Sequence, residues 1–93
     1  MSILDRDTIK AHGTATIGTT AVQLRAGTPR RASCIIQNSG PGQLYVGTSA
    51  VTISNSPAIA VGGSIVLDQS TDDIWATASQ ASTVIVFVEE INL

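Results

Sequence analysis

Few side chains in this sequence have the chemistry of a catalytic centre. The one histidine, His12, lies in the early stretch 10–13, and the one cysteine, Cys34, begins the apolar run Cys34–Ile36. A cysteine nucleophile needs a nearby base, and an apolar environment raises the pKa of a thiol, so Cys34 is expected to be a small buried hydrophobic residue. His12 is expected to be exposed and without a catalytic role. The sequence therefore predicts that the protein is not an enzyme.

The acidic residues also lack the arrangement of a catalytic pair or a metal site. Glu89 and Glu90 are adjacent, so on a strand they point to opposite faces and cannot act together from one side. The segment Asp68–Asp73 places oxygen ligands at the first, third and fifth positions of a calcium loop. It has Asp73 where that loop needs glycine and Ser79 where it needs a bidentate glutamate. No metal or cofactor is predicted.

Arginines and aromatic residues are candidates for contacts with a partner. Arg25, Arg30 and Arg31 could pair with Glu89 or Glu90 inside the domain or with acids on a partner, and internal pairing is the favoured interpretation.

Tyr45, Trp75 and Phe87 are the three aromatic residues, too few for the stacking platforms of sugar-binding sandwiches or single-strand binders. Trp75 could be one exposed stacking residue, but a core or interface position is favoured. Aromatic stacking therefore gives no strong prediction of a ligand.

Length and composition restrict the function further. A chain of 93 residues allows one domain, and its net charge of −2 gives no field that would hold a nucleic-acid backbone. The longest apolar run, Val84–Val88, is far shorter than a membrane-spanning helix, and residues 1–10 lack the apolar core of a signal peptide. We expect a soluble protein made in a reducing compartment, with no nucleic acid and no membrane as partner.

The elements that carry these residues are predicted to be β-strands. Val, Ile and Thr supply 30 of the 93 residues, whereas Glu and Lys supply three, and branching at Cβ favours extended backbone. Glycine and proline clusters divide the chain into about eight or nine short segments, with hairpins expected through Ser39–Gly42 and Gly62–Gly63. The expected strands are 7–17, 21–25, 31–38, 43–46, 51–54, 58–61, 64–67, 74–78 and 83–90. This pattern predicts an all-β fold, an antiparallel β-sandwich that is jelly-roll-like.

The segment Thr83–Val88 is apolar on both of its faces, which a strand with one solvated face does not need. Either Ile85 and Phe87 or the alternating valines Val84, Val86 and Val88 must be covered by something other than the domain's own core. The cover could be the N-terminal segment folded back over the sheet, or a neighbouring subunit. We expect residues 1–13 to be an N-terminal arm and residues 14–93 to be the sandwich domain. The hypothetical interface consists of Ile3, Leu4, Ile9, Ile85, Phe87, Arg30 and Arg31.

An ordered set of short motifs covers about four-fifths of the chain. These motifs are 30–40 (RRASCIIQNSG), 44–47 (LYVG), 59–65 (IAVGGSI), 73–78 (DIWATA) and 84–90 (VIVFVEE). In this order they resemble small virion proteins of tailed bacteriophages. The resemblance implies a compact β-sandwich that decorates or cements a capsid, or that forms the base of head fibres or tail structures, commonly as a trimer. It implies no catalytic residue.

The favoured function is therefore a non-enzymatic structural protein of a phage virion. It would be made in the host bacterial cytoplasm, self-associate symmetrically, with a homotrimer favoured, and contact the major capsid protein or another virion protein. The alternative is a carbohydrate-binding or adhesin-like tail or fibre module with a glycan site around Trp75 or Tyr45. An enzyme or an inhibitor of a host factor is disfavoured because histidine, cysteine and paired acids are scarce.

Overall fold

The computed structural model describes residues 8–68 and 71–92, without the side chains of residues 8, 9 and 68. Within these ranges the backbone forms seven strands and no helix, which confirms the predicted all-β fold. No helix among the described residues could span a membrane. The strands are β1 (Thr8–Ile17), β2 (Val22–Arg25), β3 (Arg31–Gly40), β4 (Leu44–Gly47), β5 (Ser64–Asp68), β6 (Ile74–Ala78) and β7 (Thr83–Asn92).

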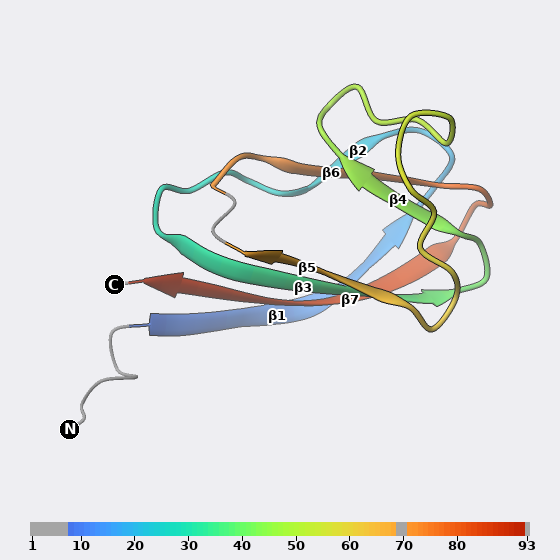
Figure 1. Cartoon of the computed structure of the whole chain (residues 1–93). Helices are drawn as coiled ribbons and strands as arrows, with labels where there is room; N and C mark the ends of the chain where they lie inside the picture. The colour runs from blue at the N-terminus through green and yellow to red at the C-terminus, as the bar shows by residue number, and fades with distance from the viewer. Residues whose placement is uncertain (1–7, 69–70, 93) are drawn as a thin grey trace.

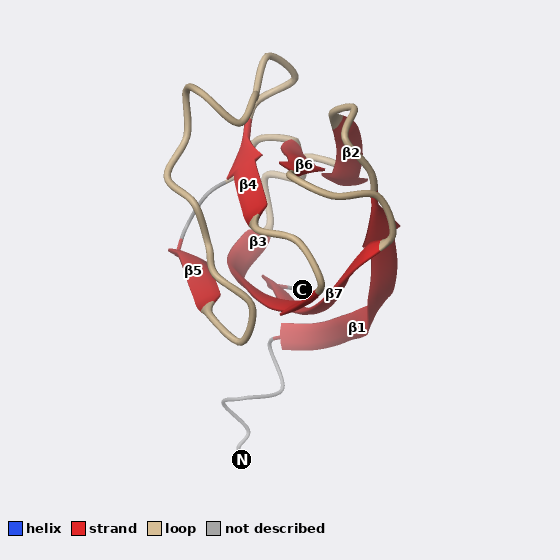
Figure 2. Ribbon diagram, turned by 90° about the vertical axis from the view of Figure 1, so that its right-hand side faces the viewer, coloured by secondary structure: helices blue, strands red, loops and turns tan. Residues whose placement is uncertain are grey.

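The strands form two antiparallel sheets that face each other as the layers of a sandwich (Figure 1 and Figure 2). The four-stranded sheet has the order β1-β7-β3-β5, and the three-stranded sheet has the order β2-β6-β4. Successive strands thus alternate strictly between the two sheets, so that every connection crosses from one layer to the other. The sandwich is confirmed, whereas a jelly roll is not.

The predicted hairpin through Ser39–Gly42 is wrong, because β3 and β4 lie in different sheets. The side-chain amide of Asn38, which is fully buried, holds the segment after β3 by hydrogen bonds as the chain crosses to the other sheet. Its Nδ2 donates to the carbonyls of Gly42 (2.9 Å) and Ile59 (2.8 Å), and its Oδ1 accepts from the Gly40 N–H (2.8 Å). Gly40 has φ +85°, and a Cβ there would lie 2.9 Å from a methyl group of Val61, so only glycine fits.

Residues 51–54 and 58–61 do not form the predicted strands. Residues 48–56, here called the 48–56 loop, satisfy their hydrogen bonds locally, for example through Val51 N–H to the Thr48 carbonyl (2.9 Å). The backbone of Gly62 and Gly63 bonds to Asn38 of β3, so the predicted hairpin between residues 58–61 and 64–67 does not form. Within residues 58–61, Ile59 makes an isolated bridge to Leu44.

Residues 8–13 of the expected N-terminal arm belong to β1, which pairs with β7 along its whole length, from Thr8↔Asn92 to Ile17↔Thr83. Gly13 does not break the strand. It lies opposite Phe87, and a Cβ at Gly13 would be in ordinary van der Waals contact with the ring, at 3.4 Å. Ile3 and Leu4 lie outside the described residues.

The space between the sheets is filled by small and medium apolar side chains. Cys34 is fully buried on the inner face of β3, as its apolar setting predicts. The buried members of this core are Ile17, Cys34, Ile36, Leu44, Ile74, Ala76, Ala78, Ile85 and Phe87. The core therefore draws on both sheets.

Replacing Asn38 with alanine is expected to lower the free energy of unfolding by about 3 kcal/mol, because the substitution leaves the Gly40 N–H and two carbonyls without these partners in a buried site. Urea unfolding followed by circular dichroism measures the change. Asn55→Ala is the matched control, since Asn55 makes two comparable bonds in an exposed loop and should cost under about 1 kcal/mol. Equal losses in the two variants would contradict the role assigned to Asn38.

Candidate functional site

A buried ionic cluster centred on Glu89 closes one end of the sandwich. Glu89 points inward from β7, and its side chain is 2% exposed. Its Oε2 accepts from Arg31 Nε (2.6 Å), and its Oε1 accepts from Arg25 Nε (3.0 Å) and Nη2 (2.7 Å). The two sheets are joined here, because Arg25 ends β2 whereas Arg31 and Glu89 belong to the four-stranded sheet. Internal pairing of these two arginines is therefore confirmed.

The guanidinium of Arg31 also holds two connecting segments. Its Nη1 donates to the Asp72 carbonyl (2.7 Å), and its Nη2 donates to the Ala26 carbonyl (2.5 Å). Arg25 additionally places its guanidinium 4.7 Å from the centre of the Phe87 ring, a cation–π geometry. The cluster thus satisfies its charges with the protein's own groups.

The ionisation of Glu89 depends on these arginines. Burial alone raises the pKa of Glu89, but hydrogen bonds from Arg31 and Arg25 and their positive charges outweigh burial, so the pKa is lowered from its ordinary value. A carboxylate held ionised in this way accepts hydrogen bonds and has no proton to give at neutral pH. The cluster is structural, and general acid catalysis is not its chemistry.

Cys34 and His12 do not form a reactive centre. The pKa of the Cys34 thiol is raised, first by burial and then by the negative charge of Glu89, against the opposing effect of the two arginines. His12 is exposed on β1, opposite Val88 of β7. Among the described residues no three histidine, cysteine or acidic side chains gather as metal ligands.

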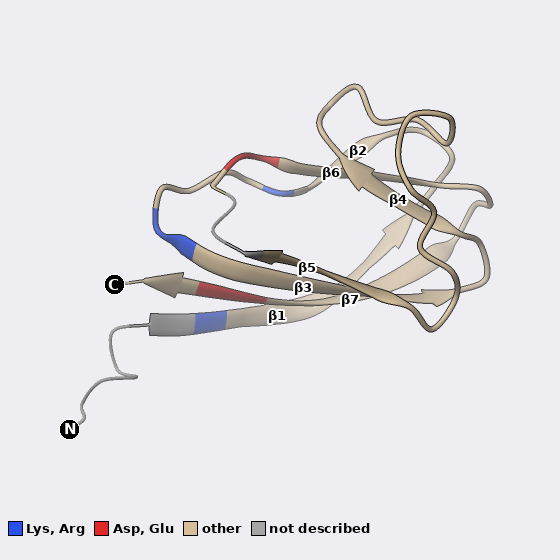
Figure 3. Ribbon diagram, in the orientation of Figure 1, with Lys and Arg blue, Asp and Glu red and all other residues tan. Residues whose placement is uncertain are grey.

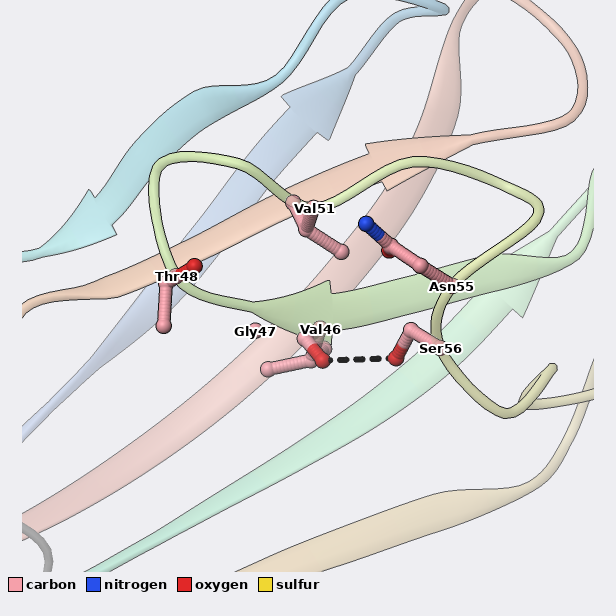
Figure 4. Close-up of a pocket in the computed structure, with 6 residues that line it drawn as sticks. All are labelled: Val46, Gly47, Thr48, Val51, Asn55 and Ser56. Atoms are coloured by element: carbon pink, nitrogen blue, oxygen red, sulfur yellow. Dashed lines mark hydrogen bonds between the residues drawn. The ribbon is translucent and has the colours of Figure 1, made fainter.

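The hollow drawn in Figure 4 lies between β4 and the 48–56 loop and has a volume of about 260 Å³. Its polar side chains serve the loop itself. Ser56 Oγ donates to the Val46 carbonyl (2.9 Å), and Asn55 bonds to Ala50 and Thr52. Val51 is buried against Gly47, so that the loop covers this part of the outer face of the three-stranded sheet.

The two candidate sugar-stacking residues have different environments. Tyr45 is buried, and its hydroxyl donates to Gln43 Oε1 (3.0 Å). Trp75 is partly exposed on the outer face of β6, between Gln23 of β2 and Gly47 of β4. Of the two, Trp75 alone presents its ring to solvent.

The outer face of the four-stranded sheet is apolar along β7 and polar along β1, where His12, Thr14 and Thr16 are exposed opposite the valines. Gln37 of β3, which pairs with Val86 and Ser64, is also polar and exposed. On β7, Ile85 and Phe87 point into the core, which removes them from the hypothetical interface, and the outward residues are the alternating valines. Cross-strand pairing places Ile35 of β3 between Val88 and Val66 of β5. The set called here the apolar face consists of Val66, Ile35, Val88, Val86 and Val84, each 36–54% exposed.

Charge is segregated from the apolar face. The described Lys, Arg, Asp and Glu residues lie toward the end of the sandwich where β3 begins and β7 ends (Figure 3). Lys10 lies 3.9 Å from Glu90 at this end, and Arg30 is exposed in the turn before β3. Ile9 lies in β1, but its side chain is outside the described part of the structure.

Comparison with known proteins shows the fold alone. No family model and no curated protein matches the sequence. A solved structure from work on Bacillus endospore appendages, a novel family of disulfide-linked pili, is similar, with a TM-score of 0.57 over 92% of this chain and 87% of that one. The two chains are 14% identical.

Acid is expected to weaken the fold through Glu89. Its stabilisation is complete above the ordinary pKa of 4.5 and is lost as pH falls below that value through the lowered pKa of the folded state. Glu89→Gln should lower the free energy of unfolding at pH 7 by about 3 kcal/mol, because it leaves two arginines without their counter-charge, and should flatten the acid dependence. Urea titrations between pH 7 and 2 measure both effects. Glu90→Gln, on the outer side of the same strand, is the control, and an identical pH profile for both variants would contradict the prediction.

Native Cys34 is expected to react with a thiol reagent such as Ellman's reagent roughly 100-fold more slowly than the unfolded chain, because the thiol is buried and its pKa is raised. Labelling rates in buffer and in denaturant give the comparison. Fast labelling of the folded protein would show that the inner face of β3 is accessible.

Proposed function

We propose that the protein is a non-enzymatic structural subunit that binds a second copy of itself through the apolar face. The main observation in support of this proposal is that the apolar face is continuous. Its five exposed aliphatic side chains lie in neighbouring rows on the adjacent strands β7, β3 and β5. Monomeric soluble proteins rarely leave such a surface in water. The 48–56 loop covers part of the other sheet, and no described segment covers this one.

The size of the sheet supports the same partner. Three ten-residue strands and the shorter β5, at about 4.8 Å spacing and about 3.3 Å rise, give a sheet of up to about 20 by 33 Å, on the order of the area that each partner buries in a standard interface. The apolar face is the part of this sheet over β7, Ile35 and Val66, so polar residues such as Thr14 and Gln37 would share the interface. The absence of described charges from the middle of this surface favours a partner surface of the same kind. A second copy presents one.

The similar fold in Bacillus pili supports a role in assemblies but does not transfer their chemistry. Those pili are disulfide-linked, whereas Cys34 is the one cysteine of this sequence and is fully buried. We therefore propose that copies of this chain associate without a covalent link. The proposal includes no catalytic role, because the buried charges of Glu89, Arg25 and Arg31 are paired with one another.

The sequence resemblance supports a more specific proposal, that the assembly is a phage virion which the protein decorates or cements, as a trimer on the capsid. This part rests on the motif order alone. Face-to-face packing of one patch on two copies produces a two-fold dimer, whereas in a trimer each subunit contacts two neighbours through two different surfaces. Solution mass distinguishes the two arrangements.

Light scattering over a tenfold dilution, with Val86→Lys as the test variant, examines self-association. Val86 lies near the middle of the apolar face, and a lysine there should weaken association roughly 100-fold, about 2.8 kcal/mol at 1.4 kcal/mol per tenfold, while circular dichroism remains unchanged. Ile53→Lys is the control, since Ile53 is an exposed aliphatic residue (56%, against 37% for Val86) that lies in the 48–56 loop. A wild-type monomer at every concentration, or equal effects of both variants, would overturn the proposal.

A further inference from the structure

Trp75 lines a notch on the outer side of the three-stranded sheet, away from the apolar face. The turn after β4 and the segment before β6 form the two sides of this notch, which has a volume of about 260 Å³. A second hollow of about 180 Å³ adjoins it and shares three of its residues. The lining residues of the notch are Thr48, Ser49, Asp72, Asp73 and Trp75.

One carboxylate and one backbone carbonyl of the notch are held in place by the rest of the fold. Asp73 Oδ1 accepts from the Gly27 N–H (2.5 Å), which fixes that carboxylate against the loop after β2. The Asp72 carbonyl accepts from buried Arg31, so its backbone is tied to the ionic cluster although its side chain is exposed. Groups that are already positioned lose little conformational freedom when a ligand binds.

Among the described residues that line the notch, Asp72 and Asp73 are carboxylates and none is basic. Charged residues of both signs lie at this end of the sandwich (Figure 3). They are Lys10, Arg25, Arg30 and Arg31, with Asp72, Asp73, Glu89 and Glu90. Lys10 pairs with Glu90, and Arg25 and Arg31 pair with Glu89. The carboxylates of the notch can accept hydrogen bonds from hydroxyls and can also attract a cation, so the test includes both kinds of probe.

We propose that this notch binds a saccharide. One face of a sugar ring carries C–H groups that pack on an indole ring, and its hydroxyls are donors for carboxylates and partners for the hydroxyls of Thr48 and Ser49. A notch of this size holds a single ring, with a dissociation constant in the millimolar range. The site lies on the opposite sheet from the apolar face, so it does not depend on self-association.

The sole tryptophan of the sequence makes the test direct, because intrinsic fluorescence reports on Trp75 alone. Methyl glycosides of glucose, galactose, mannose and N-acetylglucosamine are titrated into the full chain at millimolar concentrations, with sorbitol as an acyclic control. A saturable change with at least one glycoside and none with sorbitol is expected. Asp72→Asn should weaken this binding about tenfold, because the amide replaces one acceptor oxygen with a donor.

Glu90→Gln is the matched control, since it removes the same charge from the four-stranded sheet and should leave glycoside binding unchanged. Tetramethylammonium and guanidinium are titrated in parallel as cationic probes. The proposal is overturned if no glycoside gives a saturable change, if Glu90→Gln weakens binding as much as Asp72→Asn, or if the cations bind more tightly than every glycoside. Circular dichroism of both variants separates loss of binding from loss of fold.

Discussion

Burial of the Glu89 carboxylate is the constraint on which the rest of this structure depends. A charge in that position has to meet opposite charge and hydrogen-bond donors within the protein, and Arg25 and Arg31 supply both from two different sheets. Arg31 extends the same network to the connections before β3 and β6. One acidic side chain thereby fixes the relative position of both layers and of the segments that carry Asp72 and Asp73.

The two outer surfaces of the sandwich are consequently unlike. The 48–56 loop packs Val51 onto the three-stranded sheet, and that sheet carries the aromatic and polar groups of the notch. On the four-stranded sheet, β7 directs a row of valines outward, beside Ile35 of β3 and Val66 of β5. Such a division suits a subunit that is held in an assembly by one sheet and leaves the other accessible.

Composition and turn residues predicted the all-β class and most of the strands, although residues 51–54 and 58–61 form none. They could not predict which strands pair with one another. The pattern of Thr83–Val88 left open which side faces the core. The internal pairing of Glu89 with Arg31 decides it, because alternate residues of a strand share a face and Glu89 therefore points the same way as Ile85 and Phe87. The hairpins were not predictable, since sheet membership after β3 depends on bonds from Asn38 to Gly42 and Ile59. Likewise, Thr48 reaches Trp75 only through the pairing of Gly47 with Trp75.

The alternation of strands between sheets has a kinetic consequence. No strand is bonded to the next one along the chain, so no two-stranded unit forms locally as a starting point, and the first native pairings have to close long loops. β1 and β7, at opposite ends of the described chain, pair only when the whole domain is present. Proteins dominated by such distant contacts fold in roughly milliseconds to seconds. During synthesis the four-stranded sheet therefore stays incomplete until β7 has left the ribosome.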